Sequence, residues 1–298
     1  MKKNIMKEKA KKDKKNILIT GAYGYLGSVL LNKFYQKNCN IFVLEKEEPK
    51  ERKKNVEYLI ADISDKDELE KHKIIFKKID IIIHLAAYVP QEKSFDNLEK
   101  SLNINLQGSI NLANLLKEKS IFIYSNTCEI YSPLTFYAVS KLSAEKYLEI
   151  ICKKRGIKFI SLRFASIYGP GEKIQRAIPN FIKSAIKNED ITIFGDGGEK
   201  RSYLYIEDAV LAITKAVDYS KDGIFDISTE EAITILRLAE LIRKITGSKS
   251  KIIFKPQMKE KKDLVFDIEK AKKVLHFKPK ISLMQGLKKE IEYFKKYE

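Results

Sequence analysis

The chain has 298 residues, enough to bury a full core in one large domain or two closely joined ones. No apolar run approaches the roughly 20 residues that a membrane span requires, so we expect no membrane segment. The formal net charge is +17, but the lysines are spread singly and lack the interleaved aromatic residues of a base-stacking surface, so we do not expect nucleic-acid binding.

Residues 1–15 contain eight lysines and no apolar face, which predicts a disordered basic tail. This segment lacks the apolar stretch and small-residue cleavage site of a secretion signal. The three cysteines of the chain show no C-x-x-C spacing, which fits a reducing compartment, and we expect the protein in the cytoplasm. The three histidines are scattered, and we predict no metal site.

From Asn16 onward, short aliphatic segments alternate with helical ones. The expected strands, buried on both faces, are 16–20, 40–45, 56–61, 79–85, 120–125 and 157–164; the helices between them include 25–37, 94–118 and 135–155. Strands that alternate with helices imply right-handed crossovers and a parallel, doubly wound α/β sheet. We therefore predict a Rossmann domain over residues 16–168.

After about Tyr168, glycine- and proline-marked loops separate shorter elements. The sequence reads Y-G-P-G at 168–171 and G-D-G-G at 195–198, and helices are expected at 174–187, 233–246 and 283–296. We predict a smaller C-terminal α/β substrate lobe over residues 169–298. A segment at about 203–228 is expected to return to the Rossmann domain.

A glycine-rich turn, T-G-A-Y-G-Y-L-G at 20–27, directly follows the first expected strand. Gly21 allows a tight turn, Gly24 lets the backbone approach a pyrophosphate, and Gly27 lets the next helix pack on the strand. The phosphates are expected at the helix N-terminus. Glu45, at the end of the second strand, can accept hydrogen bonds from ribose hydroxyls and would repel a 2′-phosphate. This favours NAD over NADP, although the adjacent Lys46 could accommodate that phosphate.

Tyr137 and Lys141 are four residues apart, so they share one face of an expected helix. An ammonium near a phenol stabilises the phenolate and lowers the pKa of the tyrosine, as a general acid/base acting on an alcohol requires. Thr127 follows the strand at 120–125. The three side chains are therefore expected to converge at the carboxyl edge of the sheet, where such folds bind ligands.

Together these motifs resemble the extended short-chain dehydrogenase/reductases, and in particular their nucleotide-sugar epimerase/dehydratase members, such as the UDP-glucose 4-epimerases. The resemblance runs from Asn16 to the C-terminus. It rests on the glycine turn, A-D-I at 61–63, H-L-A-A at 84–87, N-L-Q-G-S from Asn105, S-N-T-C-E-I-Y at 125–131, Y-x-x-x-K at 137–141, L-R-F-A-S-I-Y-G-P-G at 162–171, G-D-G-G-E-K-R-S-Y-L-Y-I-E-D-A at 195–209 and F-D-I-E-K-A-K-K-V-L at 266–275.

The resemblance implies a role for each matching residue. In the active site, Thr127 would hydrogen-bond the sugar hydroxyl, Tyr137 would exchange its proton, and Lys141 would hold the nicotinamide ribose. Arg201 would contact the nucleotide diphosphate, and Glu129 and Ser166 are candidate substrate contacts. The implied cofactor site comprises Gly21, Tyr23, Gly24, Tyr25, Leu26, Gly27, Glu45, Asp62, Ile63, Leu85, Ala86, Ala87, Asn105, Tyr137 and Lys141. Relatives also suggest a homodimer formed by the helices near 94–118 and 135–155.

The sequence departs from the family pattern in places that bear on the reaction. Ser132 replaces a usual glycine, Ser166 a usual asparagine, and lysines near 261–262 a late arginine. Sugar 4,6-dehydratases typically carry Thr-Asp-Glu where this chain has T-C-E at 127–129, so Cys128 removes one of the two groups that eliminate water. UDP-glucuronate decarboxylases share a Thr-x-Glu pattern, so Glu129 does not exclude them.

We expect a nucleotide-sugar 4-epimerase that uses NAD and passes through a transient 4-keto sugar, with Tyr137 as acid/base. A 4-dehydrogenase or ketoreductase would use the same residues and differ only in releasing cofactor or product. A 4,6-dehydratase is a further alternative. A non-catalytic NAD-binding regulatory or RNA-associated protein is the alternative from another class, and the retained Thr127, Tyr137 and Lys141 argue against it.

Overall fold

The computed structural model describes residues 14–37, 39–90, 97–133, 135–172, 174–256 and 262–297. Most of the predicted tail, residues 1–13, lies outside these ranges, as do residues 94–96 at the start of one expected helix and Lys261. Among the helices of the described ranges, none is long and apolar enough to cross a bilayer.

Seven parallel strands form the central sheet, in the order β11-β6-β5-β4-β1-β2-β3. Their bounds are β1 (Asn16–Thr20), β2 (Asn40–Glu45), β3 (Val56–Ile60), β4 (Ile81–His84), β5 (Ile121–Thr127), β6 (Lys158–Phe164) and β11 (Gly223–Ile227). The predicted Rossmann-type α/β fold is therefore confirmed. The strand order reverses between β1 and β4, which is where open parallel sheets bind ligands.

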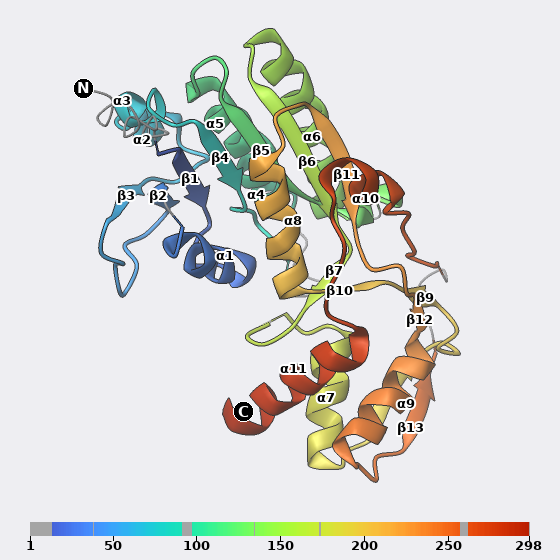
Figure 1. Cartoon of the computed structure of the whole chain (residues 1–298). Helices are drawn as coiled ribbons and strands as arrows, with labels where there is room; N and C mark the ends of the chain where they lie inside the picture. The colour runs from blue at the N-terminus through green and yellow to red at the C-terminus, as the bar shows by residue number, and fades with distance from the viewer. Residues whose placement is uncertain are drawn as a thin grey trace, which may run out of the picture.

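Aliphatic side chains alternate between the two faces of this sheet. Along β1, Ile17 and Ile19 pack into one cluster and Leu18 into another. The first face is covered by α1 (Tyr25–Tyr35), α8 (Ile206–Asp218) and α10 (Glu269–Leu275), and the second by α2 (Lys66–Glu70), α3 (Lys73–Phe76), α5 (Ser109–Leu115) and α6 (Phe136–Lys154) (Figure 1). Burial on both faces explains why the strands are almost continuously apolar.

The helix expected at 94–118 is divided into three parts. Its described portion consists of α4 (Leu98–Lys100), a π-helix at Ser101–Gly108, and α5. A Cβ on Gly108 would lie 2.7 Å from Ile63 Cγ1, so a side chain there would require Ile63 to shift. Apolar spacing does not distinguish a π-helical turn from an α-helical one, and the sequence alone did not predict it.

The C-terminal part of the chain has its own apolar cluster. The helices α7 (Ala177–Lys187) and α9 (Ile235–Thr246) pack against β8 (Ile191–Phe194), which pairs in parallel with β13 (Ile252–Lys255). The helix α11 (Leu283–Tyr297) packs on the other side of α7 (Figure 1). Of the helix expected at 233–246, the first two residues form β12 (Ile233–Thr234), which pairs with β9 (Lys200–Arg201). The boundary between the two predicted domains near residue 168 stays a prediction. At this boundary β7 (Ser166–Tyr168) pairs with β10 (Tyr203–Tyr205).

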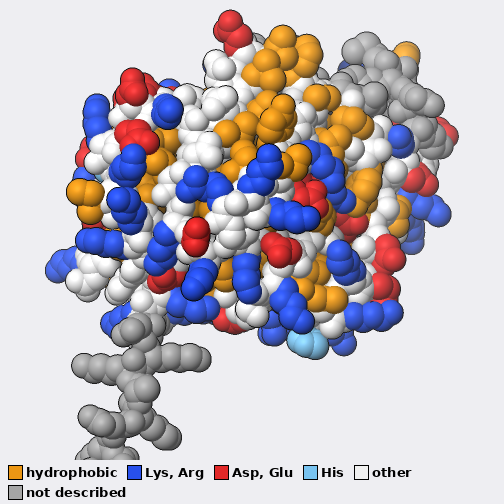
Figure 2. All heavy atoms as spheres, turned by 90° about the horizontal axis from the view of Figure 1, so that it is seen from above, with side chains coloured by type: hydrophobic (Ala, Val, Ile, Leu, Met, Phe, Trp, Pro, Cys, Tyr) orange, Lys and Arg blue, Asp and Glu red, His pale blue; other side chains and the backbone are white. Residues whose placement is uncertain are grey.

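The charged side chains are distributed rather than clustered on the face shown in Figure 2. Lysine and arginine side chains lie among acidic and hydrophobic ones over this face. Charges of both signs that are interspersed in this way produce weaker local fields than a single-sign patch of the same net charge.

Candidate active site

The glycine turn joins β1 to α1 in a conformation that two of its glycines require. Gly21 has φ +67°, where side chains are strained. A Cβ on Gly27 would lie 2.0 Å from the carbonyl oxygen of Gly21, so any side chain there would push the helix away from the turn. The close packing expected from the glycine spacing is therefore present.

The N-terminus of α1 is suited to an anion. Gly24 is its N-cap and provides no side-chain cap, and the first turn contains no acidic residue. The first backbone N–H groups of a helix have no partner within the helix, and the helix dipole favours negative charge there. These features fit the pyrophosphate of a dinucleotide.

Glu45 lies at the end of β2 beside this turn. Its Oε1 accepts a hydrogen bond from the backbone N–H of Tyr23 at 2.9 Å, and burial raises the pKa of Glu45. Lys46 Nζ lies 2.9 Å from Asp62 Oδ2. Lys46, the cation that the sequence offered for a 2′-phosphate, is therefore paired with a carboxylate.

A buried polar cluster fixes the end of β4. His84 is 1% exposed, and its ring nitrogens lie 2.7 Å from Thr20 Oγ1 and 3.0 Å from Ser109 Oγ. Thr20 Oγ1 also accepts the backbone N–H of Ala86 at 3.1 Å. Asn105, in the π-helix, accepts the N–H of Tyr88 and donates to its carbonyl, at 2.8 and 3.0 Å. These contacts hold residues 85–88 along the side of the cleft.

A single cleft brings together most of the predicted site. Its lining includes, from the sequence prediction, Gly21, Gly24, Tyr25, Leu26, Gly27, Leu85, Ala87, Thr127, Glu129, Tyr137 and Lys141. Tyr23, Glu45, Asp62, Ile63, Ala86, Asn105, Ser166 and Arg201 are not among the described lining residues. Asp62 opens instead onto a surface hollow with Lys46, and Arg201 Nη2 donates to Glu199 at 2.6 Å.

Tyr137 and Lys141 both reach this cleft from α6, whose N-cap Thr135 accepts the N–H of Ala138. Lys141 is 3% exposed, and its Nζ lies 4.0 Å from the ring centroid of Tyr124, a cation–π arrangement. Burial lowers the pKa of Lys141 to about 7, while the Glu145 carboxylate acts in the opposite direction. The lysine therefore changes its charge near neutral pH.

We predicted that Lys141 lowers the pKa of Tyr137, and this was wrong: in the structure the pKa of Tyr137 is raised. Burial and then Glu129 raise the pKa of Tyr137 above its ordinary value, and the group that lowers it is Arg176. Lys141 is itself desolvated and only partly charged at pH 7, which weakens its influence on the phenol.

Several polar or charged residues of the cleft were not predicted from the sequence. Asn126, Glu172 and Arg176 all line the cleft. Arg176 Nε lies 3.8 Å from Glu172 Oε1, and burial raises the pKa of Glu172 to about 7. Glu172 follows the Y-G-P-G turn, and Arg176, inside the helix expected at 174–187, is the N-cap of α7. Neither belongs to a motif that would place it in the site. Within the described ranges, no cluster of three or more potential ligands could hold a metal ion.

Comparison with known proteins identifies the family. Residues 17–228 match the model of the NAD dependent epimerase/dehydratase family. An uncharacterized UDP-glucose epimerase of Bacillus subtilis is 30% identical over 306 residues, which cover 93% of this chain and 97% of that protein. The chain belongs to this family. It is accordingly an NAD-dependent enzyme, and the predicted cofactor is confirmed.

Other members of the family extend the likeness. The structure of UDP-glucose 4-epimerase from Thermotoga maritima, with UDP-glucose, is 29% identical, with TM-score 0.83 and coverage of 94% of this chain and 99% of that one. UDP-glucuronic acid 4-epimerase from Bacillus cereus, with UDP-glucuronic acid and NAD, is 25% identical, with TM-score 0.84 and coverage of 95% and 100%. A UDP-glucuronic acid decarboxylase of Danio rerio is 28% identical, over 96% of this chain and 74% of that protein.

The buried amine of Lys141 predicts a specific pH dependence of stability. Between the folded pKa of about 7 and the higher unfolded value, the unfolded chain binds more protons. The penalty for burying the ammonium is complete below pH 7, so the free energy of unfolding should rise as pH increases, by at most about 1.4 kcal/mol per pH unit. Lys141→Met should remove this rise, as measured by urea unfolding at pH 7.5 and 9.5. Equal slopes for both proteins would contradict the burial of a charged amine.

Proposed function

We propose that the protein is a nucleotide-sugar 4-epimerase acting through a transient 4-keto sugar. The observation that carries this proposal is one cleft lined by the glycine turn, Thr127, Tyr137 and Lys141. In the proposed reaction, Tyr137 removes the proton of the C4 hydroxyl and later returns it to the same oxygen, and inversion requires the hydride to come back to C4 on the other face of the ketone. Thr127 hydrogen-bonds the same oxygen, and Lys141 lines the same cleft.

The chain's residues fit the cofactor of the family. Bound NAD⁺ would accept the hydride from C4 and would give it back to C4 after the 4-keto sugar has rotated in the site. We propose that the N-terminus of α1 binds its pyrophosphate and that Glu45 binds the adenosine ribose, with Tyr23, Asp62, Ile63 and Asn105 shaping the surrounding walls. Lys141 would bind the nicotinamide ribose.

We propose a UDP-linked sugar as the substrate, since relatives that match almost the full chain are named as UDP-sugar enzymes. Arg201 and Ser166 lie outside the described lining of the cleft, and their proposed contacts with the nucleotide would require the substrate to extend beyond it. The guanidinium of Arg201 is partly neutralised by Glu199, 2.6 Å away. The nucleotide contact of Arg201 therefore competes with an existing ion pair.

The environment of Cys128 argues against water elimination. Its thiol is 2% exposed and donates to the carbonyl oxygen of Arg163 at 3.1 Å, and burial raises the pKa of Cys128. A dehydratase needs a proton donor at this position. Because the thiol is buried and its pKa is raised, it cannot donate a proton to the leaving hydroxyl. A 4-epimerase requires no such donor.

A second candidate is decarboxylation of a UDP-linked uronic acid. Arg176 lines the cleft with Tyr137, and a guanidinium suits a sugar carboxylate. A 4-keto uronic acid is a β-keto acid, which loses CO₂ more readily than its parent. Glu129 lines the same cleft, and a relative covering 96% of the chain is named as such a decarboxylase.

Incubation with UDP-glucose, UDP-glucuronic acid and their GDP, CDP and dTDP counterparts, followed by proton NMR, tests the proposal. We expect a 4-epimer of one substrate without net NADH formation. A UDP-pentose would support the decarboxylase instead, a 6-deoxy-4-keto product the dehydratase, and stoichiometric NADH a dehydrogenase. Purified protein that turns over none of these sugars would contradict the proposed function.

Tyr137→Phe should lower kcat by about 10³-fold or more, because no other group in the proposal exchanges the C4 proton. The ring still fills its place, so NADH affinity, measured by fluorescence titration, should remain within about threefold. Tyr297→Phe, which removes an exposed hydroxyl on α11 away from the cleft, is the matched control and should leave kcat unchanged. Wild-type activity in the Phe variant would remove Tyr137 from the mechanism.

We propose a homodimer formed through α6 and the neighbouring helical segment at 98–108. Exposed apolar side chains follow one face of α6 at helical spacing, namely Phe136, Val139, Tyr147 and Ile150, and Leu98 and Leu102 are exposed on the adjacent segment. A contiguous apolar surface of this kind is typical of an interface. Tyr147→Lys should shift the protein from dimer to monomer in sedimentation velocity, whereas Lys146→Ala, its exposed neighbour, should not. A monomeric wild-type protein would contradict the proposal.

We also propose that the protein works in the cytoplasm. Cys39, Cys128 and Cys152 are all free thiols, and two of them are buried. Thiols that remain reduced are typical of a reducing compartment.

A further inference from the structure

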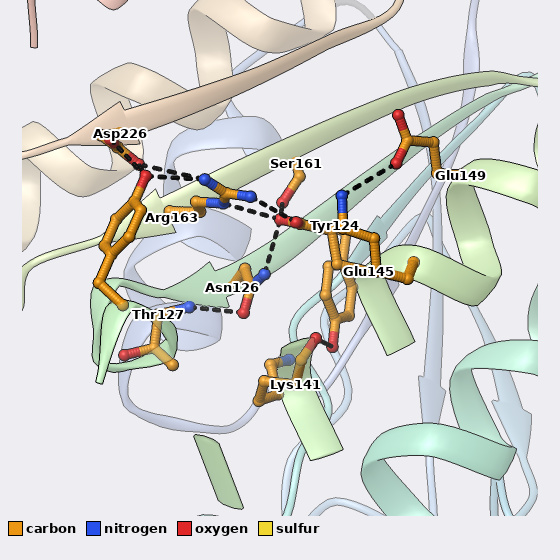
Figure 3. A network of polar contacts seen from close by, with 11 residues as sticks. Tyr124, Asn126, Thr127, Lys141, Glu145, Glu149, Ser161, Arg163 and Asp226 are labelled. Atoms are coloured by element: carbon orange, nitrogen blue, oxygen red, sulfur yellow. Dashed lines mark hydrogen bonds and ion pairs between the residues drawn. The ribbon is translucent and has the colours of Figure 1, made fainter. Parts of the chain in front are cut away.

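A buried carboxylate lies directly behind the proposed active site. Glu145 is on α6, one turn beyond Lys141, and is fully buried. Its Oε2 accepts hydrogen bonds from Asn126 Nδ2 at 2.8 Å, Ser161 Oγ at 2.7 Å and Arg163 Nε at 2.9 Å. Its Oε1 accepts Arg163 Nη2 at 2.6 Å. Four hydrogen bonds from three residues therefore converge on this one side chain (Figure 3).

This carboxylate is held in its ionised form. Burial alone would raise the pKa of Glu145, but hydrogen bonds from Arg163, Ser161 and Asn126 lower it overall. The bidentate contact with Arg163 is the geometry in which a guanidinium binds a carboxylate most strongly. Because the pair is buried and both oxygens are occupied, the position of Glu145 is fixed on α6.

A single residue, Asn126, connects Glu145 to Thr127 at the carboxyl edge of the sheet. Asn126 donates to Glu145 and, through Oδ1, accepts the backbone N–H of Thr127 at 2.8 Å. Thr127 Oγ1 in turn accepts the N–H of Glu129 at 3.2 Å. Both Thr127 and Glu129 line the cleft. In Figure 3 Asn126 lies between Glu145 and Thr127.

A second branch anchors the other end of the same turn. Arg163 Nη1 donates to Tyr131 Oη at 2.7 Å, and the Tyr131 hydroxyl donates to Asp226 at 2.7 and 2.8 Å. Tyr131 ends the 3₁₀ turn Cys128–Tyr131 that follows Thr127. The turn is thus fixed at its start through Asn126 and at its end through Arg163, and both branches meet at Glu145.

We propose that Glu145 is a positioning residue that, through Asn126, keeps the hydroxyl of Thr127 in register with the phenol of Tyr137. α6 carries Tyr137, Lys141 and Glu145, whereas Thr127 is on β5. The two groups proposed to contact the C4 oxygen, Tyr137 and Thr127, therefore come from different elements. The Glu145–Asn126–Thr127 path joins them through two hydrogen bonds of 2.8 Å. A displacement of about 1 Å at such a site can cost about 100-fold in rate. This inference rests on the proposed 4-epimerase reaction.

The chain offers a matched pair of variants that separates positioning from stability. Asn126→Ala and Ser161→Ala each remove one donor to the same Oε2 of Glu145, and both side chains are buried. Only Asn126 continues to Thr127. The ion pair between Glu145 and Arg163 remains in both variants, so both should fold, with comparable decreases in Tm.

Asn126→Ala should lower kcat for the epimerised sugar by about 10- to 100-fold, with NADH affinity unchanged, whereas Ser161→Ala should stay within about twofold of wild type. Glu145→Gln removes the nearer of two carboxylates beside Arg163, leaving Asp226 at 4.0 Å, and serves only as a supplement. If it folds, its kcat loss should not multiply with that of Asn126→Ala, because both act on one path. Equal kcat in the Asn126 and Ser161 variants would overturn the inference.

Amide hydrogen exchange provides a readout that does not depend on turnover. The N–H of Thr127 is bonded to Asn126, so Asn126→Ala should increase its exchange rate and that of Glu129, while Ser161→Ala should not. Unchanged exchange at Thr127 in Asn126→Ala would also overturn the inference. Failure of wild-type protein to convert any nucleotide sugar would instead contradict the proposed function, and the exchange result would still decide the positioning claim.

Discussion

The amine of Lys141, buried at the carboxyl edge of the parallel sheet, is the constraint on which the site depends. Removing an ammonium from water disfavours its charge, which the ring of Tyr124 at 4.0 Å and the Glu145 carboxylate partly compensate. The pKa of about 7 means that a small change in surroundings switches the charge of the lysine. Tyr137, the phenol that we propose to exchange the C4 proton, lines the same cleft as this lysine.

The fold brings the necessary parts to this point. Reversal of the strand order between β1 and β4 opens a crevice at the glycine turn, and the next two strands outward, β5 and β6, supply Thr127 and the arginine that fixes Glu145. Because all seven strands are parallel, their carboxyl ends lie along one edge. The cofactor turn and the acid/base helix consequently meet although more than 100 residues separate them.

Much of this arrangement could be predicted from the sequence, because it depends on local signals. The strands are nearly continuous aliphatic runs, Gly21 and Gly27 are required by backbone geometry, and Tyr137 and Lys141 share a helix face. The π-helix around Asn105 could not be predicted, since it differs from an α-helix in hydrogen bonding and not in composition. The place of Asn126, Glu172 and Arg176 in the cleft could not be predicted, because it depends on how the fold brings distant segments together. The raised pKa of Tyr137 results from burial, which no sequence motif indicates.

The most direct test of the account follows the hydrogen at C4. A UDP-sugar that the protein converts is deuterated at C4 and incubated in ordinary water, and the product is examined by NMR. If the hydride leaves and returns within one closed site while Tyr137 moves only the hydroxyl proton, the 4-epimer should keep all of its deuterium at C4. Replacement of that deuterium by hydrogen from water would contradict the account.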